Sequence, residues 1–197
     1  GPNTITMPQV FERVFTLAGE KMSDYLQMKQ LNVHTRNVFR DNSFLDFSSQ
    51  SSEMKKQLQE LDPFAAENYD SFLAEITRLY QLSEKYFFPK MFDSFLDYLS
   101  PTLGSALLRV RPTESMHHFF SRYFKNPEII KALDRYATYI GSSPYLSPAT
   151  FAMIAYLELV QGVFYVKGGN VKIAEAYKVV AEKLGVTFHL NSEITKI

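Results

Sequence analysis

Residues 162–190 read GVFYVKGGNVKIAEAYKVVAEKLGVTFHL, and this stretch decides the fold class. Strand-like and helix-like segments alternate in it, with glycines at the joints: a strand at 163–166, a turn at Gly168 and Gly169, a helix at 171–184, a stop at Gly185 and a strand at 186–190. This order is typical of a βαβ-like unit. With a further strand starting at residues 194–197, we expect the C-terminal stretch to be part of an α/β layer whose other strands come from elsewhere.

Upstream of this stretch the sequence pattern is mostly helical. Helix starts are predicted by a capping box from Thr6 to Gln9 with Pro8 in the first turn, by Ser51, by Asp62-Pro63, by Thr113, by Asn126-Pro127 and by Ser147-Pro148. The helix after Pro63 carries an apolar face made of Phe72, Ile76, Leu79 and Tyr80.

Short alternating runs at 26–31, 37–40 and 44–47 predict a small antiparallel sheet. The fold class is therefore α+β. We expect a mostly helical domain with a small antiparallel sheet, followed by a partial α/β segment.

Composition limits the function classes. Lys+Arg and Asp+Glu each number 21, so no excess of positive charge favours nucleic acid as a partner. Cysteine is absent, which excludes thiolate chemistry and disulfides. The 17 Phe and 12 Tyr need a large core, an apolar ligand pocket or a lipid contact to bury them. The apolar run at 149–157 is far shorter than the ~20 residues that span a bilayer.

Few motifs point to chemistry. Neither G-x-G-x-x-G nor a Walker A sequence occurs, G-x-S-x-G is missing, and the four His lack metal-ligand spacing. Gly168 and Gly169 precede a helix, where they either form a tight turn or let a cofactor approach the backbone. Asp93 and Asp97 lie four residues apart in an aromatic segment. They are either an acid/base pair or part of the solvated edge of a helix. The aromatic run at 87–95 is either core or a membrane-surface patch.

Several stretches in order resemble one enzyme family. They are Gly1-Pro2-x-x-Ile5-Thr6-Met7-Pro8, Asp24-Tyr25, Asp62-Pro63, Tyr139-Ile140-Gly141-x-x-Pro144, Gly162-Val163-x-Tyr165-x-x-Gly168-Gly169 and Gly185-Val186 followed by Leu190-Asn191-Ser192-Glu193-Ile194-x-x-Ile197. Together they resemble the bacterial phytoene and dehydrosqualene desaturases, which are FAD-dependent. The resemblance covers essentially the whole chain, and it leads us to expect an internal piece of such an enzyme, without its dinucleotide-binding motif.

The resemblance implies a two-domain flavoprotein similar to monoamine oxidase. Residues 1–6 would connect from the FAD-binding unit, 7–166 would form the substrate tunnel, and 167–197 would return to the FAD domain. The implied reaction passes hydride from a C30 or C40 polyene to FAD, in a cytoplasmic enzyme held peripherally at a membrane, and the piece alone would be inactive. A sibling oxygenase, a helical module that binds an apolar ligand or partner, and an amine-oxidising flavoprotein are the alternatives.

The resemblance also implies site residues. Phe95-x-Asp97-x-Leu99 matches a family motif with a proposed acid/base carboxylate, although Leu96 replaces its arginine, so Asp97 is the catalytic candidate. Gly1 and Pro2 would approach the flavin ring, unless they are the remnant of a tag. Gly168 and Gly169 would lie near the flavin, and the backbone of Ile194 would hold adenine.

Overall fold

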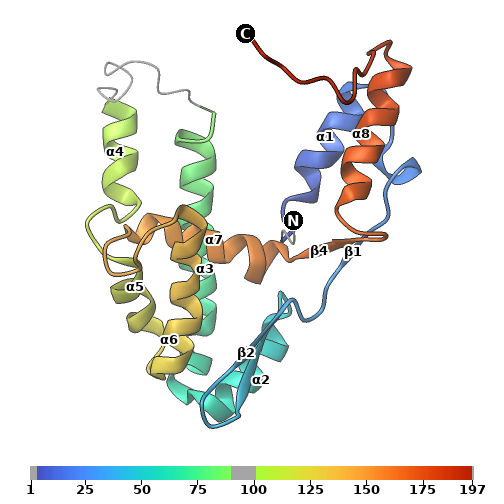
Figure 1. Cartoon of the computed structure of the whole chain (residues 1–197). Helices are drawn as coiled ribbons and strands as arrows, with labels where there is room; N and C mark the ends of the chain where they lie inside the picture. Colours follow the sequence, from blue (N-terminus) through green and yellow to red (C-terminus); the bar gives the residue numbers. More distant parts are fainter. Residues whose placement is uncertain (1–3, 90–100, 197) are drawn as a thin grey trace. The chain divides into compact units, whose positions relative to one another are not determined.

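The computed structural model describes residues 4–89 and 101–196, and the chain divides into two compact units (Figure 1). One is a continuous segment, Asn32–Gly162, which we call the helical unit. The other combines Gly1–Leu31 with Val163–Ile197, and we call it the split unit. No helix among the described residues is long and apolar enough to cross a membrane.

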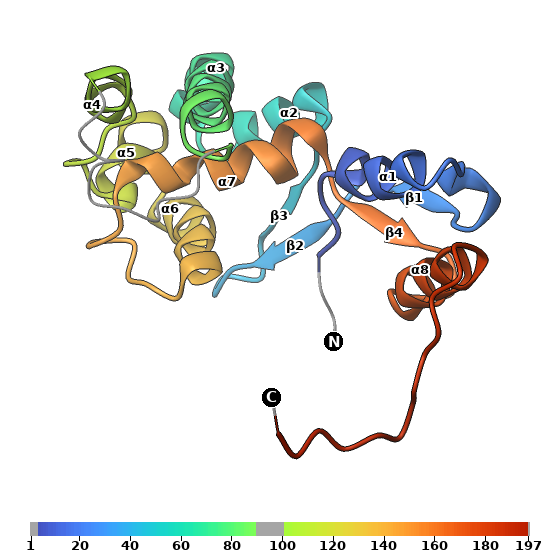
Figure 2. The same cartoon turned by 90° about the horizontal axis from the view of Figure 1, so that it is seen from above.

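The helical unit begins with a β-hairpin and continues almost entirely in helices. Its elements are β2 (Thr35–Val38), β3 (Phe44–Phe47), α2 (Ser51–Leu61), α3 (Pro63–Tyr86), α4 (Pro101–Arg109), α5 (Met116–Tyr123), α6 (Pro127–Asp134), the 3-10 helices η3 (Arg135–Ile140) and η4 (Ala149–Ala152), α7 (Met153–Tyr156) and the π-helical η5 (Leu157–Gln161). The view in Figure 2 looks down α3, which α7 crosses and α2 adjoins.

Local cap signals set most of these helix starts. The Asp62 carboxylate accepts a hydrogen bond from the Ala65 N–H at the start of α3, and the Asn126 side chain accepts one from Glu128 at the start of α6. Both predictions are confirmed. Ser115, rather than Thr113, caps α5, and Ser51 is the first residue of α2 rather than its cap.

Aromatic rings fill the core of the helical unit. Phe72 of α3 is fully buried, and its ring contacts five others at centroid distances of 5.0 to 6.3 Å, those of Tyr69, Phe119, Phe120, Tyr123 and Phe124. The predicted apolar face of α3 is buried as expected. Much of the ring surface counted in the sequence is therefore used for packing.

The helix predicted after Ser147-Pro148 is present but irregular. It changes from a 3-10 turn (η4) to an α-turn (α7) and then to a π-turn (η5), and it ends at Gly162 with φ 92°. Single π-turns occur frequently at functional sites. The side chains of η5 are therefore candidates for a functional site.

The split unit packs two helices on a short ribbon. Its elements are α1 (Pro8–Leu17), η1 (Met22–Asp24), β1 (Met28–Gln30), β4 (Phe164–Val166) and α8 (Val171–Lys183). β1 and β4 are antiparallel, with Met28 opposite Val166. The Phe15 ring of α1 is fully buried and lies 5.4 Å from the Tyr177 ring of α8, so the two helices pack side by side (Figure 1).

Several expectations for strands are wrong. β1 pairs with β4 and β2 with β3, so two two-stranded ribbons replace the single sheet expected from residues 26–47. Residues 186–190 and 194–196 form no strand, and no βαβ unit is present within the described part of the chain. A strand needs a neighbour for its backbone hydrogen bonds, and none of the described strands lies beside these residues.

The predicted capping box from Thr6 to Gln9 is also wrong. Met7, in the left-handed region at φ 55°, precedes α1 without a side-chain cap.

The compact units do not divide at the expected domain boundary. Residues 8–17 and 28–30 belong to the split unit, because α1 packs on α8 and β1 pairs with β4. The assignment of substrate and cofactor roles to the segments 1–6, 7–166 and 167–197 stays a prediction.

Candidate functional site

An apolar pocket of about 360 Å³ opens in the helical unit, beside the C-terminal ends of α3 and α4 and the start of η4 and α7. Its described lining consists of Ser83, Phe87, Phe88, Leu107, Val110, Pro112, Pro148, Thr150, Phe151 and Met153. None of these side chains carries a charge. Small-molecule sites usually have volumes of about 300–1,000 Å³ and a mostly apolar lining. The pocket is therefore at the small end of that range.

The walls of the pocket are held by neighbouring aromatic contacts. Phe88 contacts Tyr80 edge-on with ring centroids 5.9 Å apart, and Tyr80 stacks on Tyr156 of α7 at 4.4 Å. Burial, with Glu84 nearby, raises the pKa of Tyr80 to about 12, so its hydroxyl is protonated and donates a hydrogen bond to Glu84. These rings fix the end of α3 against α7, where the pocket begins.

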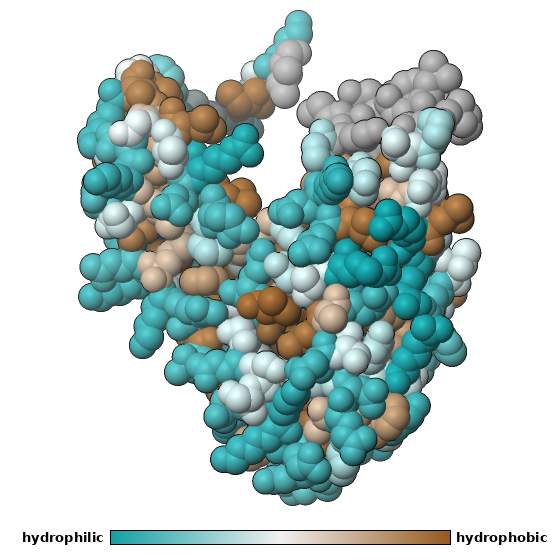
Figure 3. All heavy atoms as spheres, turned by 180° about the vertical axis from the view of Figure 1, so that it is seen from behind, coloured by the Kyte–Doolittle hydropathy of each residue, from teal (hydrophilic) through white to brown (hydrophobic). Residues whose placement is uncertain are grey.

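The apolar surface of the chain is not confined to this pocket. Figure 3 shows apolar residues as separate patches between hydrophilic ones on the face that it presents. Exposed side chains scattered in this way are usual on soluble domains and do not mark a site by themselves. The pocket differs from them because it is concave and has a continuous apolar lining.

A second cluster, buried and polar, surrounds Glu158 of η5. This carboxylate is 1% exposed and accepts hydrogen bonds from Arg135 Nη2 at 2.9 Å, from the Tyr136 hydroxyl at 3.1 Å and from the Tyr139 hydroxyl at 2.5 Å. His34 Nδ1 lies 3.7 Å from Glu158 Oε2. Buried charges are stable only when they are paired and hydrogen-bonded in this way.

The electrostatics of this cluster follow from burial. Desolvation lowers the pKa of His34, although Glu158 opposes the shift, and burial together with Glu158 raises the pKa of Tyr136 well above its usual value. His34 and Tyr136 are therefore neutral, and the charges of Glu158 and Arg135 balance. Sequence reasoning missed the cluster because its members lie far apart along the chain and carry no spacing signal.

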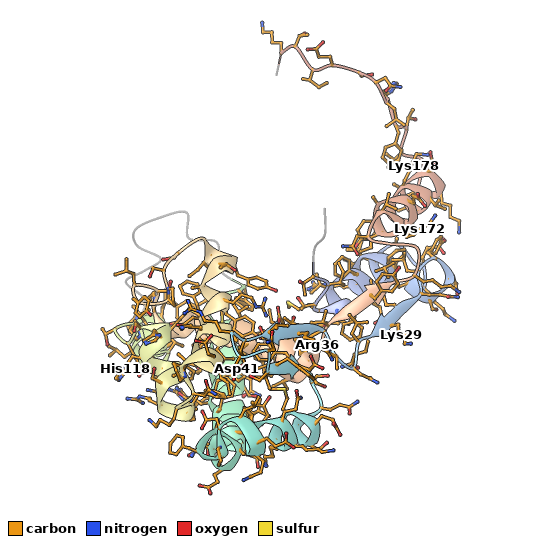
Figure 4. The ribbon with its side chains drawn as sticks, turned by 60° about the horizontal axis from the view of Figure 1, so that its bottom comes forward. Lys29, Arg36, Asp41, His118, Lys172 and Lys178 are labelled. Carbon is orange, nitrogen blue, oxygen red and sulfur yellow. The ribbon has the colours of Figure 1, made fainter. Side chains whose placement is uncertain are left out.

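His117 and His118 are adjacent on α5 and have separate partners. His117 Nδ1 lies 2.8 Å from Asp134 Oδ2, whereas His118 Nε2 lies 3.8 Å from Glu114 Oε1. His118, labelled in Figure 4, lines a polar pocket of about 590 Å³ together with Arg111, Glu114 and Arg122. Ion pairs from Glu114 to both arginines, and from Glu75 to Arg111, offset their charge.

In the split unit, Gly168 and Gly169 form the turn between β4 and α8, with φ 88° and 87°. A Cβ on Gly168 would lie 3.1 Å from the side chain of Lys172, which Figure 4 labels on α8, whereas a Cβ on Gly169 would meet nothing within 4 Å. The backbone at Gly169 is thus open to close approach. This geometry fits the expected flavin contact in steric terms, and it fits a plain tight turn equally well.

Of the other predicted site residues, Ile194 alone belongs to the described part of the chain. The Ile194 side chain is exposed, and its backbone belongs to no described strand. Asp97, Gly1 and Pro2 lie outside the described residues, as does Asp93. Their roles therefore stay predictions.

No protein-family model matches the chain. Among curated proteins, a 4,4'-diapolycopene oxygenase of Methylomonas sp is 34% identical over the whole chain and 40% of its own length. A zeta-carotene-forming phytoene desaturase of Myxococcus xanthus is 32% identical over the whole chain and 38% of its own length. A 4,4'-diapophytoene desaturase of Staphylococcus haemolyticus is 26% identical over the whole chain and 39% of its own length.

The chain thus spans about two fifths of the length of the curated relatives that it matches. The similarity covers the whole chain and therefore both compact units, and the relatives' names describe desaturation or oxygenation of carotenoids. Over its whole length the chain is therefore homologous to a part of carotenoid desaturases and oxygenases.

Proposed function

We propose that this chain contributes the polyene-binding part of a FAD-dependent carotenoid desaturase, which removes hydrogen across a C–C bond of a C30 or C40 precursor. The uncharged, aromatic-walled pocket at the end of α3 carries the proposal, because a hydrocarbon offers no hydrogen-bonding group and is bound only through buried apolar area. At about 25 cal/mol per Å² of buried apolar surface, a few rings and methyl groups supply useful affinity.

The chain's own residues bind and orient the substrate. Phe87, Phe88 and Phe151 would lie against one segment of the polyene and exclude water from it. Bound FAD would supply the hydride acceptor. In the family-based assignment, Gly168, Gly169 and the backbone of Ile194 hold part of that cofactor, together with Gly1 and Pro2, and Asp97 accepts a proton. A peripheral attachment to the cytoplasmic membrane surface would let the substrate enter from lipid.

A second candidate is oxygenation of a carotenoid. The relative from Methylomonas sp, at 34% identity, is named an oxygenase, and the pocket suits either reaction because both substrates are long apolar chains.

Expression of the intact gene together with a C30 or C40 precursor tests the proposal. Desaturation gives a product with longer-wavelength absorbance that is two mass units lighter for each new double bond, whereas oxygenation adds oxygen. A colourless, unchanged precursor would reject both reactions and favour a non-enzymatic apolar-binding module.

A pocket variant connects the reaction to the proposed site. Phe88→Glu places a charge on the half-exposed wall, and we expect at least a tenfold loss of product. Leu146→Glu is the matched control, since Leu146 is exposed outside the described pocket lining. Equal losses in both variants would argue against the pocket.

A further inference from the structure

One polar group in the apolar pocket has no hydrogen-bonding partner among the described residues. Ser83 of α3 lines the pocket and is 1% exposed, and its hydroxyl forms no hydrogen bond with any described residue. The other polar side chain of the described lining, Thr150, donates its hydroxyl proton to the Val110 carbonyl at 2.6 Å. Ser83 therefore contributes the single unpaired polar side chain of that lining.

A serine or threonine inside a helix normally satisfies its hydroxyl on the carbonyl four residues earlier. Thr77 does so on the same helix, donating to Leu73 O at 2.7 Å, and Ser121 of α5 donates to His117 O at 2.8 Å. Ser83 departs from this arrangement although it belongs to the same regular helix. An unpaired buried hydroxyl destabilises the fold, because it gives up its hydrogen bonds to water without replacement.

The need for a small side chain does not explain the serine. Alanine would leave at least as much room, form helix more readily and bury no unpaired group. The exception thus points to a hydrogen-bonding partner that is not among the described residues.

We propose that Ser83 binds the single oxygen of an otherwise apolar isoprenoid chain whose end occupies this pocket. A serine hydroxyl can donate to a carbonyl or accept from an alcohol, so both oxygenated ends fit. A carboxylate does not fit, because no cationic side chain is present among the described lining residues. This inference rests on the proposed function, in that the pocket must hold part of an oily chain.

The size of the pocket limits what enters. At about 30 Å³ for each water-sized group, a volume near 360 Å³ holds on the order of a dozen non-hydrogen atoms. A C30 or C40 chain would place only one end here. Ser83 would therefore distinguish chains by the oxidation state of that end.

The test measures how this chain binds two isoprenoids with the same C15 skeleton, the alcohol farnesol and the hydrocarbon farnesene. Each displaces a fluorescent apolar dye, with wild-type protein and with Ser83→Ala. We expect Ser83→Ala to weaken farnesol binding about fivefold, which corresponds to ~1 kcal/mol, and to leave farnesene binding unchanged. Ser105→Ala, an exposed serine on α4 outside this pocket's described lining, is the matched control and should change neither affinity.

The outcomes separate the two proposals. If neither isoprenoid binds the wild-type protein, the pocket as an oily-chain site fails, and the Ser83 inference fails with it. If both bind but Ser83→Ala changes both equally, or neither, the Ser83 inference alone is overturned. Circular dichroism should give Ser83→Ala a thermal midpoint equal to or above that of wild type, since an unpaired buried group has been removed.

Discussion

The two compact units differ in how completely their own residues bury their helices. In the helical unit, α3 has nine buried residues and is covered by neighbouring helices, with Phe72 in contact with five other rings. In the split unit, Phe15 is the single buried residue of α1, while apolar side chains on both helices stay exposed, including Leu17 of α1 at 79% and Val171 of α8 at 61%.

This difference indicates that the helical unit supplies most of the stability of the chain. An amphipathic helix is stabilised chiefly by burying its apolar face against other elements. α3 satisfies this condition within its own unit, and α1 and α8 satisfy it only in part. The expected consequence is two levels of local stability within one chain.

The largest expected effect separates the two levels. Phe72→Ala removes a fully buried ring, and we expect a loss of about 3–5 kcal/mol in the free energy of unfolding of the helical unit. Phe15→Ala removes an equally buried ring but should release only α1 and α8. Hydrogen exchange measured by mass spectrometry distinguishes the two cases, and a loss of protection in α3 after Phe15→Ala would contradict the comparison.

The next largest loss of stability is expected from removing the buried Glu158 carboxylate of η5. Glu158→Ala leaves Arg135 without its partner in a desolvated site, and we expect a loss of about 3 kcal/mol in chemical denaturation. Glu175→Ala is the control in the split unit, because it breaks an exposed pair with Lys172 and should cost less than ~0.5 kcal/mol. Similar losses for the two variants would refute the assignment of Glu158 as a buried structural charge.

Removing the Asp62 cap should cause a smaller loss of stability, which is also confined to the helical unit. Its carboxylate accepts from the backbone N–H groups of Ala65, Lys125 and Asn126, and thereby joins the starts of α3 and α6. Asp62→Ala should cost about 2 kcal/mol, measured by urea unfolding. Asp62→Asn keeps one acceptor oxygen and should recover part of the loss; no recovery would mean that the bonds to Lys125 and Asn126 dominate.

The same contrast decides what could be predicted from the sequence. The starts of α3 and α6 were predictable because a cap residue and the following proline act within one turn. The pairing of β1 with β4 was not predictable, since it joins Met28 to Val166, near opposite ends of the chain, and the local pattern favours a nearer partner. Residues 186–190 show the same limit: their strand-like alternation has no neighbour to pair with in the described part of the chain.

The candidate site shows a similar division. The aromatic composition predicted a large core, an apolar ligand pocket or a lipid contact, and the pocket wall uses Phe151 from the apolar run at 149–157. The location of the pocket, the unpaired Ser83 and the Glu158 cluster were not predictable. Each depends on side chains that only tertiary packing brings together, such as His34 with Glu158.

A pH effect on the helical unit is expected from His34. Burial lowers its pKa in the folded state, so the unfolded chain binds more protons below pH 6.5 and stability falls as the pH is lowered through this range. One group contributes at most ~1.4 kcal/mol per pH unit. His34→Gln should remove this part of the pH dependence, with Glu158 and Arg135 still in place. If the stability of His34→Gln and of wild type depended on pH in the same way between pH 7.5 and pH 5.5, the pKa of His34 would not be lowered in the folded state.

The smallest effect concerns one glycine in each unit, for which the comparison predicts opposite signs. Gly104 lies inside α4 with open space around it, so Gly104→Ala should stabilise the helical unit by about 0.5–1 kcal/mol, because alanine restricts the unfolded chain and favours helix. Gly169 also has open space, but its φ of 87° is strained for alanine, so Gly169→Ala should destabilise the split unit by about 1 kcal/mol. Thermal midpoints for the two variants test the pair: the same sign for both would mean that open space, not backbone conformation, decides what a methyl group does at these positions.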